Sequence, residues 1–199
     1  MFRGYYMEKL IVASNNKGKI KEIKEILKDV YEIVPMGEVG FDEEIEENGS
    51  TFFENALIKA KAVSEALGVN ALADDSGLCV DALGGAPGIY SARFSGVHGD
   101  DAANRKKLLS ELKNLKNPDE RKAKFVSSVV LYKRGGEVVS GIGETHGIIG
   151  FKEEGENGFG YDSLFVSDDL GKSFGLATAE EKNAVSHRKR ALIDLLRHL

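Results

Sequence analysis

Two adjacent aspartates, Asp74 and Asp75, directly follow the short apolar run of residues 71–73. The apolar run is typical of a buried strand end, and such a strand delivers carboxylates to the mouth of a sheet, where ligands of α/β proteins bind. Carboxylates side by side repel each other and require a counter-charge, commonly a divalent cation such as Mg²⁺. A solvated turn is the alternative interpretation, because Asp, Ser and Gly all favour turns.

Strand and helix patterns alternate in the first part of the chain. Residues 9–13 and 31–34 are typical of strands, and residues 20–30 between them carry apolar side chains at helical spacing. A second helix begins at the capping box of residues 51–54 and ends at Gly68. With the strand that ends in the aspartates, the order is β-α-β-α-β, which predicts an α/β fold with a parallel component.

The second half of the chain predicts an antiparallel extension of the sheet. A helix over residues 99–115 precedes a strand over residues 125–132, and a Gly-Gly hairpin turn leads into a returning strand over residues 137–141. Residues 147–151 form one more expected strand. A capping box that begins at Thr178 then opens the final helix.

A polar loop with two lysines, Lys17 and Lys19, joins the first strand to the first helix. A loop at a helix N-terminus offers free backbone N–H groups and the positive end of the helix dipole, which suit a phosphate. The loop is neither a G-x-G-x-x-G nor a Walker A sequence, so those nucleotide-binding folds are not indicated. An ordinary capped helix start with solvated lysines is the alternative. The candidate phosphate-binding residues are Ser14, Asn15, Asn16, Lys17, Gly18 and Lys19.

An acidic run over residues 42–47 leads directly into the second helix. Charge runs are usually solvated. Here, however, Glu46 and Glu47 lie just before a helix start, where their carboxylates can also reach a metal ion. Together with Asp75 they are the candidate metal ligands, while Lys59 lies further along the same helix.

Two later stretches are candidates for binding a flat, polar ligand. In residues 158–162, two glycines flank Phe159, so the ring can be exposed and stack on a base. A tight turn with Phe159 in the core is the alternative. Near the start of the final helix, His187 and Arg188 follow Lys182 by about one turn, and such donors can bind carbonyl oxygens or phosphates.

The composition describes an ordinary globular protein. The 199 residues suit a single domain, and the net charge of -5 argues against a general nucleic-acid binder. One cysteine, Cys79, cannot form an internal disulfide, which favours a reducing cytoplasm. The sequence shows neither a signal peptide nor a membrane-spanning stretch, and residues 1–6 are expected to form a loose leader before Met7.

Six motifs, in this order along the chain, closely resemble those of the non-canonical purine nucleoside triphosphate pyrophosphatases. The resemblance covers nearly the whole chain from Leu10 to the final helix. The six motifs are SNNKGK at 14–19, TFFENA at 51–56 with Lys59, ADDSGL at 73–78, GGAPGIYSAR at 84–93, GFGYD at 158–162 and SHR at 186–188.

This resemblance implies a structure and an activity. The fold would be an elongated mixed α/β structure, with a long central sheet flanked by helices and two lobes around a substrate cleft. The protein would be a homodimer and would hydrolyse inosine and xanthosine triphosphates to the monophosphate and pyrophosphate with Mg²⁺. By position, Asp75 matches the catalytic carboxylate, with Asp74 and Glu47 as acidic companions. The phosphate site would include Lys19, Lys59 and Ser76, and the base site Phe159, Gly160, Tyr161, Asp162, Lys182, His187 and Arg188.

The residue chemistry agrees with this reaction and leaves alternatives open. Attack of water on the α-phosphate needs a base, a metal and cations for the leaving pyrophosphate. The sequence does not decide which carboxylate is the base and which is a ligand. Donors that bind the 6-oxygen of hypoxanthine or xanthine would reject the 6-amino group of adenine. A pyrophosphatase for pyrimidine or other modified nucleotides, or a nucleotide sensor without turnover, are the alternatives.

Overall fold

A computed structural model describes residues 7–199, and the predicted leader of residues 1–6 lies outside the described residues. The described residues form one seven-stranded sheet in the order β2-β1-β3-β4-β5-β6-β7. β1 pairs in parallel with β2 and β3, whereas every pairing from β3 to β7 is antiparallel. The strands are β1 (Glu8–Val12), β2 (Tyr31–Pro35), β3 (Ala71–Val80), β4 (Lys122–Tyr132), β5 (Val138–Ile149), β6 (Phe165–Ser167) and β7 (Lys172–Ser173).

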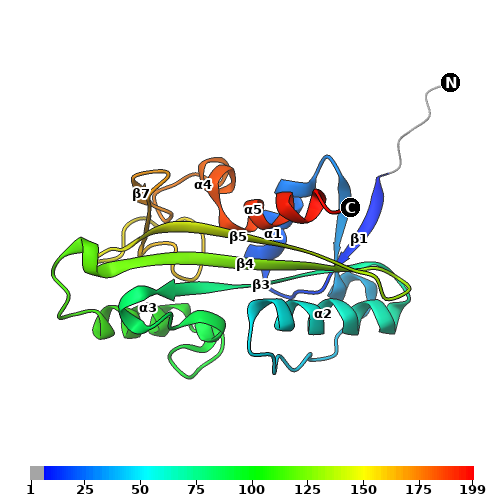
Figure 1. Cartoon of the computed structure of the whole chain (residues 1–199), viewed down its shortest axis with the longest axis horizontal. Helices are drawn as coiled ribbons and strands as arrows, with labels where there is room; N and C mark the ends of the chain where they lie inside the picture. The colour runs from blue at the N-terminus through cyan, green and yellow to red at the C-terminus, as the bar shows by residue number, and fades with distance from the viewer. Residues whose placement is uncertain (1–6) are drawn as a thin grey trace.

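Helices cover both faces of this sheet, as the α/β prediction requires (Figure 1). Figure 1 shows α2 and α3 on one side of the long strands and α1, α4 and α5 on the other. The α-helices are α1 (Lys17–Leu27), α2 (Phe52–Leu67), α3 (Asp101–Glu111), α4 (Ala179–Val185) and α5 (His187–Leu196). The 3₁₀ helices are η1 (Met36–Val39), η2 (Asp81–Leu83), η3 (Gly88–Arg93) and η4 (Pro118–Arg121). No described helix is both long enough and apolar enough to cross a bilayer.

Separate apolar clusters hold the helices on the two faces. On one face, Ala56, Ala60 and Val63 of α2 pack with Ala73 and Val130 of the sheet. The opposite face buries α1 and α5, in a cluster of Leu10, Val12, Ile23, Leu27, Leu72, Val129, Leu192 and Leu195. Burying aliphatic side chains of this size stabilises the fold by about 1.5–3 kcal/mol each, so both layers are anchored independently of any ligand.

The predicted hairpin is present, but its returning strand is longer than expected. β5 runs without interruption from Val138 to Ile149, where two strands were predicted. The prediction failed because glycines usually interrupt strands, whereas Gly141 and Gly143 stay within β5. A Cβ atom at Gly141 would collide with the carbonyl of Ala191, and one at Gly143 with that of His187. These glycines therefore let α5 approach the sheet closely.

The central prediction of a strand that ends at the aspartates is wrong. β3 continues to Val80, so Asp74 and Asp75 lie in its middle. β1 pairs only with Ala71 and Leu72 of β3. Among the described strands, none covers that edge of β3 beyond Leu72. The aspartates thus lie beside an open sheet edge and not at a strand terminus.

Candidate active site

A cavity of about 340 Å³ lies beside the open edge of β3 and gathers most of the predicted site residues. Its lining comes from the loop after β1, from α2, from β3 and η3, and from the segments around Phe159 and α5. The predicted residues that line it are Ser14, Asn15, Asn16, Lys19, Glu47, Lys59, Asp74, Asp75, Ser76, Phe159, Gly160, Tyr161, Asp162, Lys182, His187 and Arg188.

Three predicted residues lie outside this lining. Glu46 is exposed, whereas its neighbour Glu47 is half-buried and lines the cavity. Lys17 lines a separate groove along α1. Gly18 does not line the cavity, but its backbone packs against the Phe159 ring, which does. The structure therefore does not bring Glu46 to the other candidate metal ligands.

One side of the cavity holds Asp75, Glu47 and the ammonium group that joins them. Lys59 Nζ lies 3.1 Å from Asp75 Oδ1 and 2.8 Å from Glu47 Oε2. Burial raises the pKa of Asp75, and Lys59 offsets this only in part. Burial acts on Glu47 as well, but Lys59 outweighs it and holds the pKa of Glu47 below its usual value. Of the two carboxylates, Asp75 is therefore the one that takes up a proton first.

The other side of the cavity holds Asp74 in a tight set of cationic and hydroxyl partners. Lys19 Nζ lies 3.0 Å and Arg188 Nη2 3.1 Å from Asp74 Oδ2, and the Ser127 hydroxyl donates to Asp74 Oδ1. Burial opposes the charge, but Arg188 and Lys19 overcome it and hold the pKa of Asp74 well below its usual range. Asp74 is therefore a permanent anion that fixes two cations, and its low pKa makes it a poor proton acceptor.

Glu22 is a functional candidate that the sequence reasoning missed. It is buried on α1, where its carboxylate pairs with Lys182 Nζ at 2.7 Å and with the Arg188 guanidinium. Lys182 also pairs with buried Asp162 at 2.5 Å. A glutamate directly before Ile23, which lies on the apolar face of α1, was the available signal. Without Glu22 and Asp162, Lys182 would lack its buried counter-charges, and Arg188 would keep only Asp74.

His187 and Arg188 occupy the first turn of α5. The predicted final helix is interrupted at Ser186, which caps α5 by accepting from the Lys189 N–H at 3.1 Å. His187 is buried against the Phe125 ring at 4.8 Å, and burial followed by the charge of Arg188 lowers its pKa well below the usual range. Its imidazole is thus neutral, and its Nδ1 has no hydrogen-bond partner among residues 7–199.

The Phe159 ring lies between Gly18 of α1 and the ammonium group of Lys182. A Cβ atom at Gly18 would lie only 2.5 Å from Phe159 Cδ1, so the ring packs directly on the Gly18 backbone. Lys182 Nζ lies 4.7 Å from the ring centroid, in cation–π contact. The Phe159 N–H donates to Asp162 Oδ2 at 2.8 Å. These contacts give the cavity an aromatic wall next to the donors of His187 and Arg188.

The donor set fits a divalent cation that is held partly by substrate. Residues 7–199 contain no group of three or more His, Cys, Asp and Glu side chains that could hold a metal ion. Glu47 and Asp75 nevertheless converge on one point, which Lys59 Nζ contacts. Mg²⁺ commonly binds through one or two carboxylates together with substrate phosphates and water. Two converging carboxylates at an open cavity therefore match Mg²⁺ chemistry.

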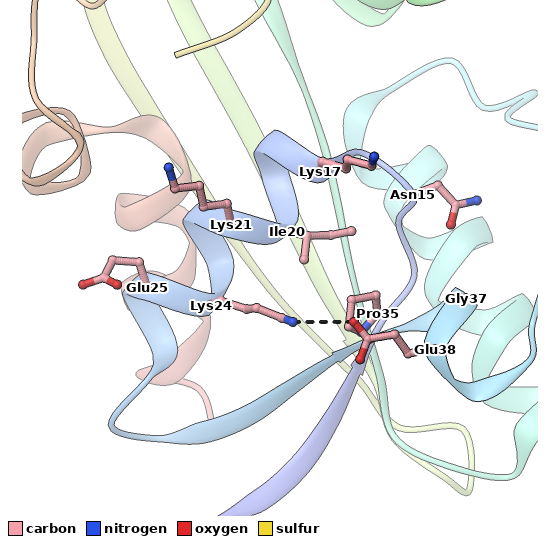
Figure 2. Close-up of a pocket in the computed structure, with 9 residues that line it drawn as sticks. All are labelled: Asn15, Lys17, Ile20, Lys21, Lys24, Glu25, Pro35, Gly37 and Glu38. Carbon is pink, nitrogen blue, oxygen red and sulfur yellow. Dashed lines mark ion pairs between the residues drawn. The ribbon is translucent and has the colours of Figure 1, made fainter. Parts of the chain in front are cut away.

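A larger and more open groove of about 580 Å³ lies along α1 (Figure 2). It carries three lysines of this helix, Lys17, Lys21 and Lys24, and Lys24 pairs with Glu38 at 3.7 Å. Neither of the paired aspartates lines this groove. It therefore lacks the acid–base residues that the cavity beside β3 contains.

The chain is similar to known proteins over nearly its whole length. The profile of the Ham1 family matches residues 10–198. The chain belongs to the Ham1 family. A Haemophilus influenzae relative named dITP/XTP pyrophosphatase is 48% identical over 188 residues, covering 93% of this chain and 95% of the relative. A Bacillus subtilis relative of the same name is 46% identical, covering 94% of each chain.

Solved structures agree with this membership. The Staphylococcus aureus Ham1 protein superimposes with a TM-score of 0.83 at 42% identity, covering 96% of this chain and 97% of that one. A Mycobacterium abscessus nucleoside-triphosphatase / dITP/XTP pyrophosphatase gives a TM-score of 0.76 at 45% identity, covering 94% and 98%. The predicted family and the predicted mixed α/β fold are therefore confirmed for this Ham1-family protein.

Proposed function

We propose that the protein hydrolyses non-canonical purine nucleoside triphosphates, namely ITP, dITP and XTP, to the monophosphate and pyrophosphate. The observation that carries this proposal is one cavity with two chemically different sides. Asp75, Glu47 and Lys59 supply acid–base and phosphate chemistry on one side. On the other side, Phe159, His187 and Arg188 supply a flat wall and hydrogen-bonding groups for a base. The names of the relatives point to the same substrates.

Asp75 is the proposed base for the attacking water. Its raised pKa makes it a better proton acceptor than an ordinary aspartate. Asp74 stays ionised and orients Lys19 and Arg188. Lys19 and Lys59 lie where they can hold phosphate oxygens. No covalent intermediate is needed for this direct displacement.

A magnesium ion is part of the proposal, with Glu47 as its protein ligand and Asp75 beside it as the base. The acidic residues that line the cavity outnumber the lysines and arginines, so a bare triphosphate would be repelled. When bound, Mg²⁺ neutralises phosphate oxygens and so favours attack at phosphorus.

We base the proposed base selection on two unpaired polar atoms on the side of the cavity that holds Phe159, His187 and Arg188. The Nδ1 atom of neutral His187 and the Nε atom of Arg188 are buried without partners among residues 7–199. Arg188 Nε carries a hydrogen and can donate to the 6-oxygen of hypoxanthine or xanthine. The 6-amino group of adenine would leave this donor unpaired, and such mismatches discriminate by about 10⁴-fold.

The protein is proposed to act as a cytoplasmic homodimer. Ile142 is 59% exposed and Val138 41% exposed, both on the outer face of β5. Exposed apolar side chains on one strand are consistent with a protein contact. Light scattering on the purified protein tests this assembly, and a monomeric mass at all concentrations would exclude it.

A substrate panel tests the proposed activity. ITP, XTP, dITP, GTP, ATP and UTP are each incubated with the protein and Mg²⁺, and both products are identified. We expect pyrophosphate and the monophosphate from ITP, dITP and XTP, with far slower turnover of ATP. Preference for UTP would favour a pyrimidine or modified-nucleotide pyrophosphatase, and tight binding without hydrolysis would favour a sensor.

A further inference from the structure

Most of the cations that line the cavity beside β3 are already neutralised by the protein itself. Four of these cations pair with one or more carboxylates. Lys19 pairs with Asp74, Lys59 with Glu47 and Asp75, Lys182 with Glu22 and Asp162, and Arg188 with Glu22 and Asp74. A triphosphate brings several negative charges, and its leaving pyrophosphate brings more as the bond breaks. A cation of the cavity without a carboxylate partner is therefore best able to bind this added charge.

Arg93 is that cation within residues 7–199. It lies at the end of η3, lines the cavity and is half-buried. Among the described residues, no Asp or Glu oxygen lies within 4.0 Å of its guanidinium, which lies over the Tyr90 ring at 5.1 Å from the centroid. A guanidinium stacked on a ring keeps its N–H edge free. Such an edge suits the bidentate binding of phosphate oxygens.

The position of η3 places Arg93 on the phosphate side of the cavity. Alternate residues of a strand share a face, so Gly77 lies on the same face of β3 as Asp75. A Cβ atom at Gly77 would lie 2.5 Å from Ser91 Oγ, and the Leu78 N–H donates to the same oxygen at 2.9 Å. The helix η3 is thus fixed against the Asp75 face, whereas Asp74 and Arg188 meet on the opposite face.

We propose that Arg93 is a further substrate-binding residue, one that holds the phosphates beyond the scissile α–β anhydride. This inference rests on the proposed function. As the water oxygen bonds to the α-phosphorus and gives its proton to Asp75, the bond from that phosphorus to the bridging oxygen breaks. The electron pair stays on the leaving pyrophosphate, whose added charge Arg93 offsets. Arg93 thereby binds the triphosphate chain and takes no part in base selection.

Variants at Arg93 and at a matched control residue test this inference. Arg93→Gln removes the charge but keeps a polar side chain, and Arg93→Lys keeps the charge but loses the fork. Lys107 is the control because its Nζ lies 4.4 Å from the Phe94 ring centroid and donates to the Phe94 carbonyl. It is exposed and does not line the cavity. Melting temperatures confirm that each variant folds.

Two inhibition constants separate a phosphate-binding role from a structural one. For Arg93→Gln, we expect kcat/KM for dITP to fall about 10- to 100-fold, the range for a lost hydrogen bond to a charged group. Inhibition by pyrophosphate is expected to weaken by a similar factor, while inhibition by dIMP stays unchanged. Arg93→Lys is expected to recover part of the loss, and Lys107→Gln to match the wild type.

The outcomes distinguish this inference from the proposed function. If the wild type hydrolyses none of the triphosphates, the proposed function fails. Calorimetric titration of pyrophosphate with Mg²⁺ then still tests Arg93 directly, and equal binding by the wild type and Arg93→Gln overturns the inference. If the wild type is active, the inference is overturned by unchanged kinetics of Arg93→Gln. It is equally overturned by equal weakening of pyrophosphate and dIMP inhibition.

Discussion

Asp74 and Asp75 are consecutive residues of β3, and their carboxylates serve opposite faces of the sheet. Asp74 pairs with Lys19 and Arg188 on the side of α1 and α5, whereas Asp75 pairs with Lys59 of α2 on the other side. Because the edge of β3 beside them is open, one cavity reaches both faces. This arrangement lets adjacent acids have opposite pKa shifts and different tasks.

The structural role of Asp74 predicts a large loss of stability on replacement. Asp74→Asn leaves Lys19 and Arg188 short of a buried counter-charge, which typically destabilises a protein by about 3–5 kcal/mol. Urea unfolding near neutral pH measures this change. Asp81→Asn is the control, because Asp81 is exposed on η2. Equal midpoints for Asp74→Asn and the wild type would contradict the assigned role.

The pH dependence of that stability difference follows from the sign of the pKa shift. Arg188 and Lys19 overcome burial and hold the pKa of Asp74 below its unfolded value of about 3.9. Its stabilising contribution is therefore complete above that unfolded value and is lost as the pH falls toward the lower folded value. The gap between wild type and Asp74→Asn is expected to be constant near neutrality and to shrink in acid. A gap that widens in acid would be inconsistent with this shift.

Lys59 sets the proton affinity of Asp75, so its removal is expected to move the pH profile of the reaction. Lys59 lowers the pKa of Asp75 against the larger effect of burial, and without it that pKa rises further. A base is lost as the pH falls through its pKa, so the acid limb of kcat/KM for dITP in Lys59→Met moves to higher pH.

Lys61→Met is the matched control for this shift. Lys61 lies on the same helix but is exposed, and it pairs only loosely with Glu65, at 3.9 Å. The pH profile of kcat/KM for dITP in Lys61→Met is expected to equal that of the wild type. An acid limb that stays in place or moves to lower pH in Lys59→Met would refute the assigned coupling.

The packing of Phe159 on Gly18 predicts a specific effect on substrate affinity. The Cβ atom in Gly18→Ala would displace the ring, so KM for dITP is expected to rise about tenfold, within the range for a lost base–aromatic stack. Gly37→Ala serves as the control, since its Cβ atom would meet no atom closer than 3.7 Å. Should Gly18→Ala keep the wild-type KM, the ring would not be part of the base site.

Much of the fold was predictable because local signals and tertiary structure agree. The capping box at Thr178 is present with both of its hydrogen bonds, and the parallel β1 and β2 flank α1 as expected. The length of β3 was not predictable, because Asp, Ser and Gly usually interrupt strands. In this protein the partners of the aspartates come from distant α1, α2 and α5, which compensate for that low propensity.

The candidate site was predictable in its members but not in its pairing. The motifs identified Asp75, Lys59 and Arg188, since these residue types at these positions are typical of the family resembled. Glu22 was missed because a glutamate on a lysine-rich helix is usually solvated. Glu46 and Glu47 are adjacent in one acidic run, and only the three-dimensional course of that loop separates them.

The turnover of dITP by Asp75→Asn tests the central claim most directly. The substitution keeps the size of the side chain but removes the carboxylate that we propose as the proton acceptor. Pyrophosphate and dIMP are quantified for the wild type, for Asp75→Asn and for the exposed control Asp81→Asn, with thermal unfolding to confirm folding. We predict that kcat falls about 10²- to 10⁴-fold in Asp75→Asn, the range for loss of a general base, and little in Asp81→Asn. Near wild-type turnover by folded Asp75→Asn would contradict the account.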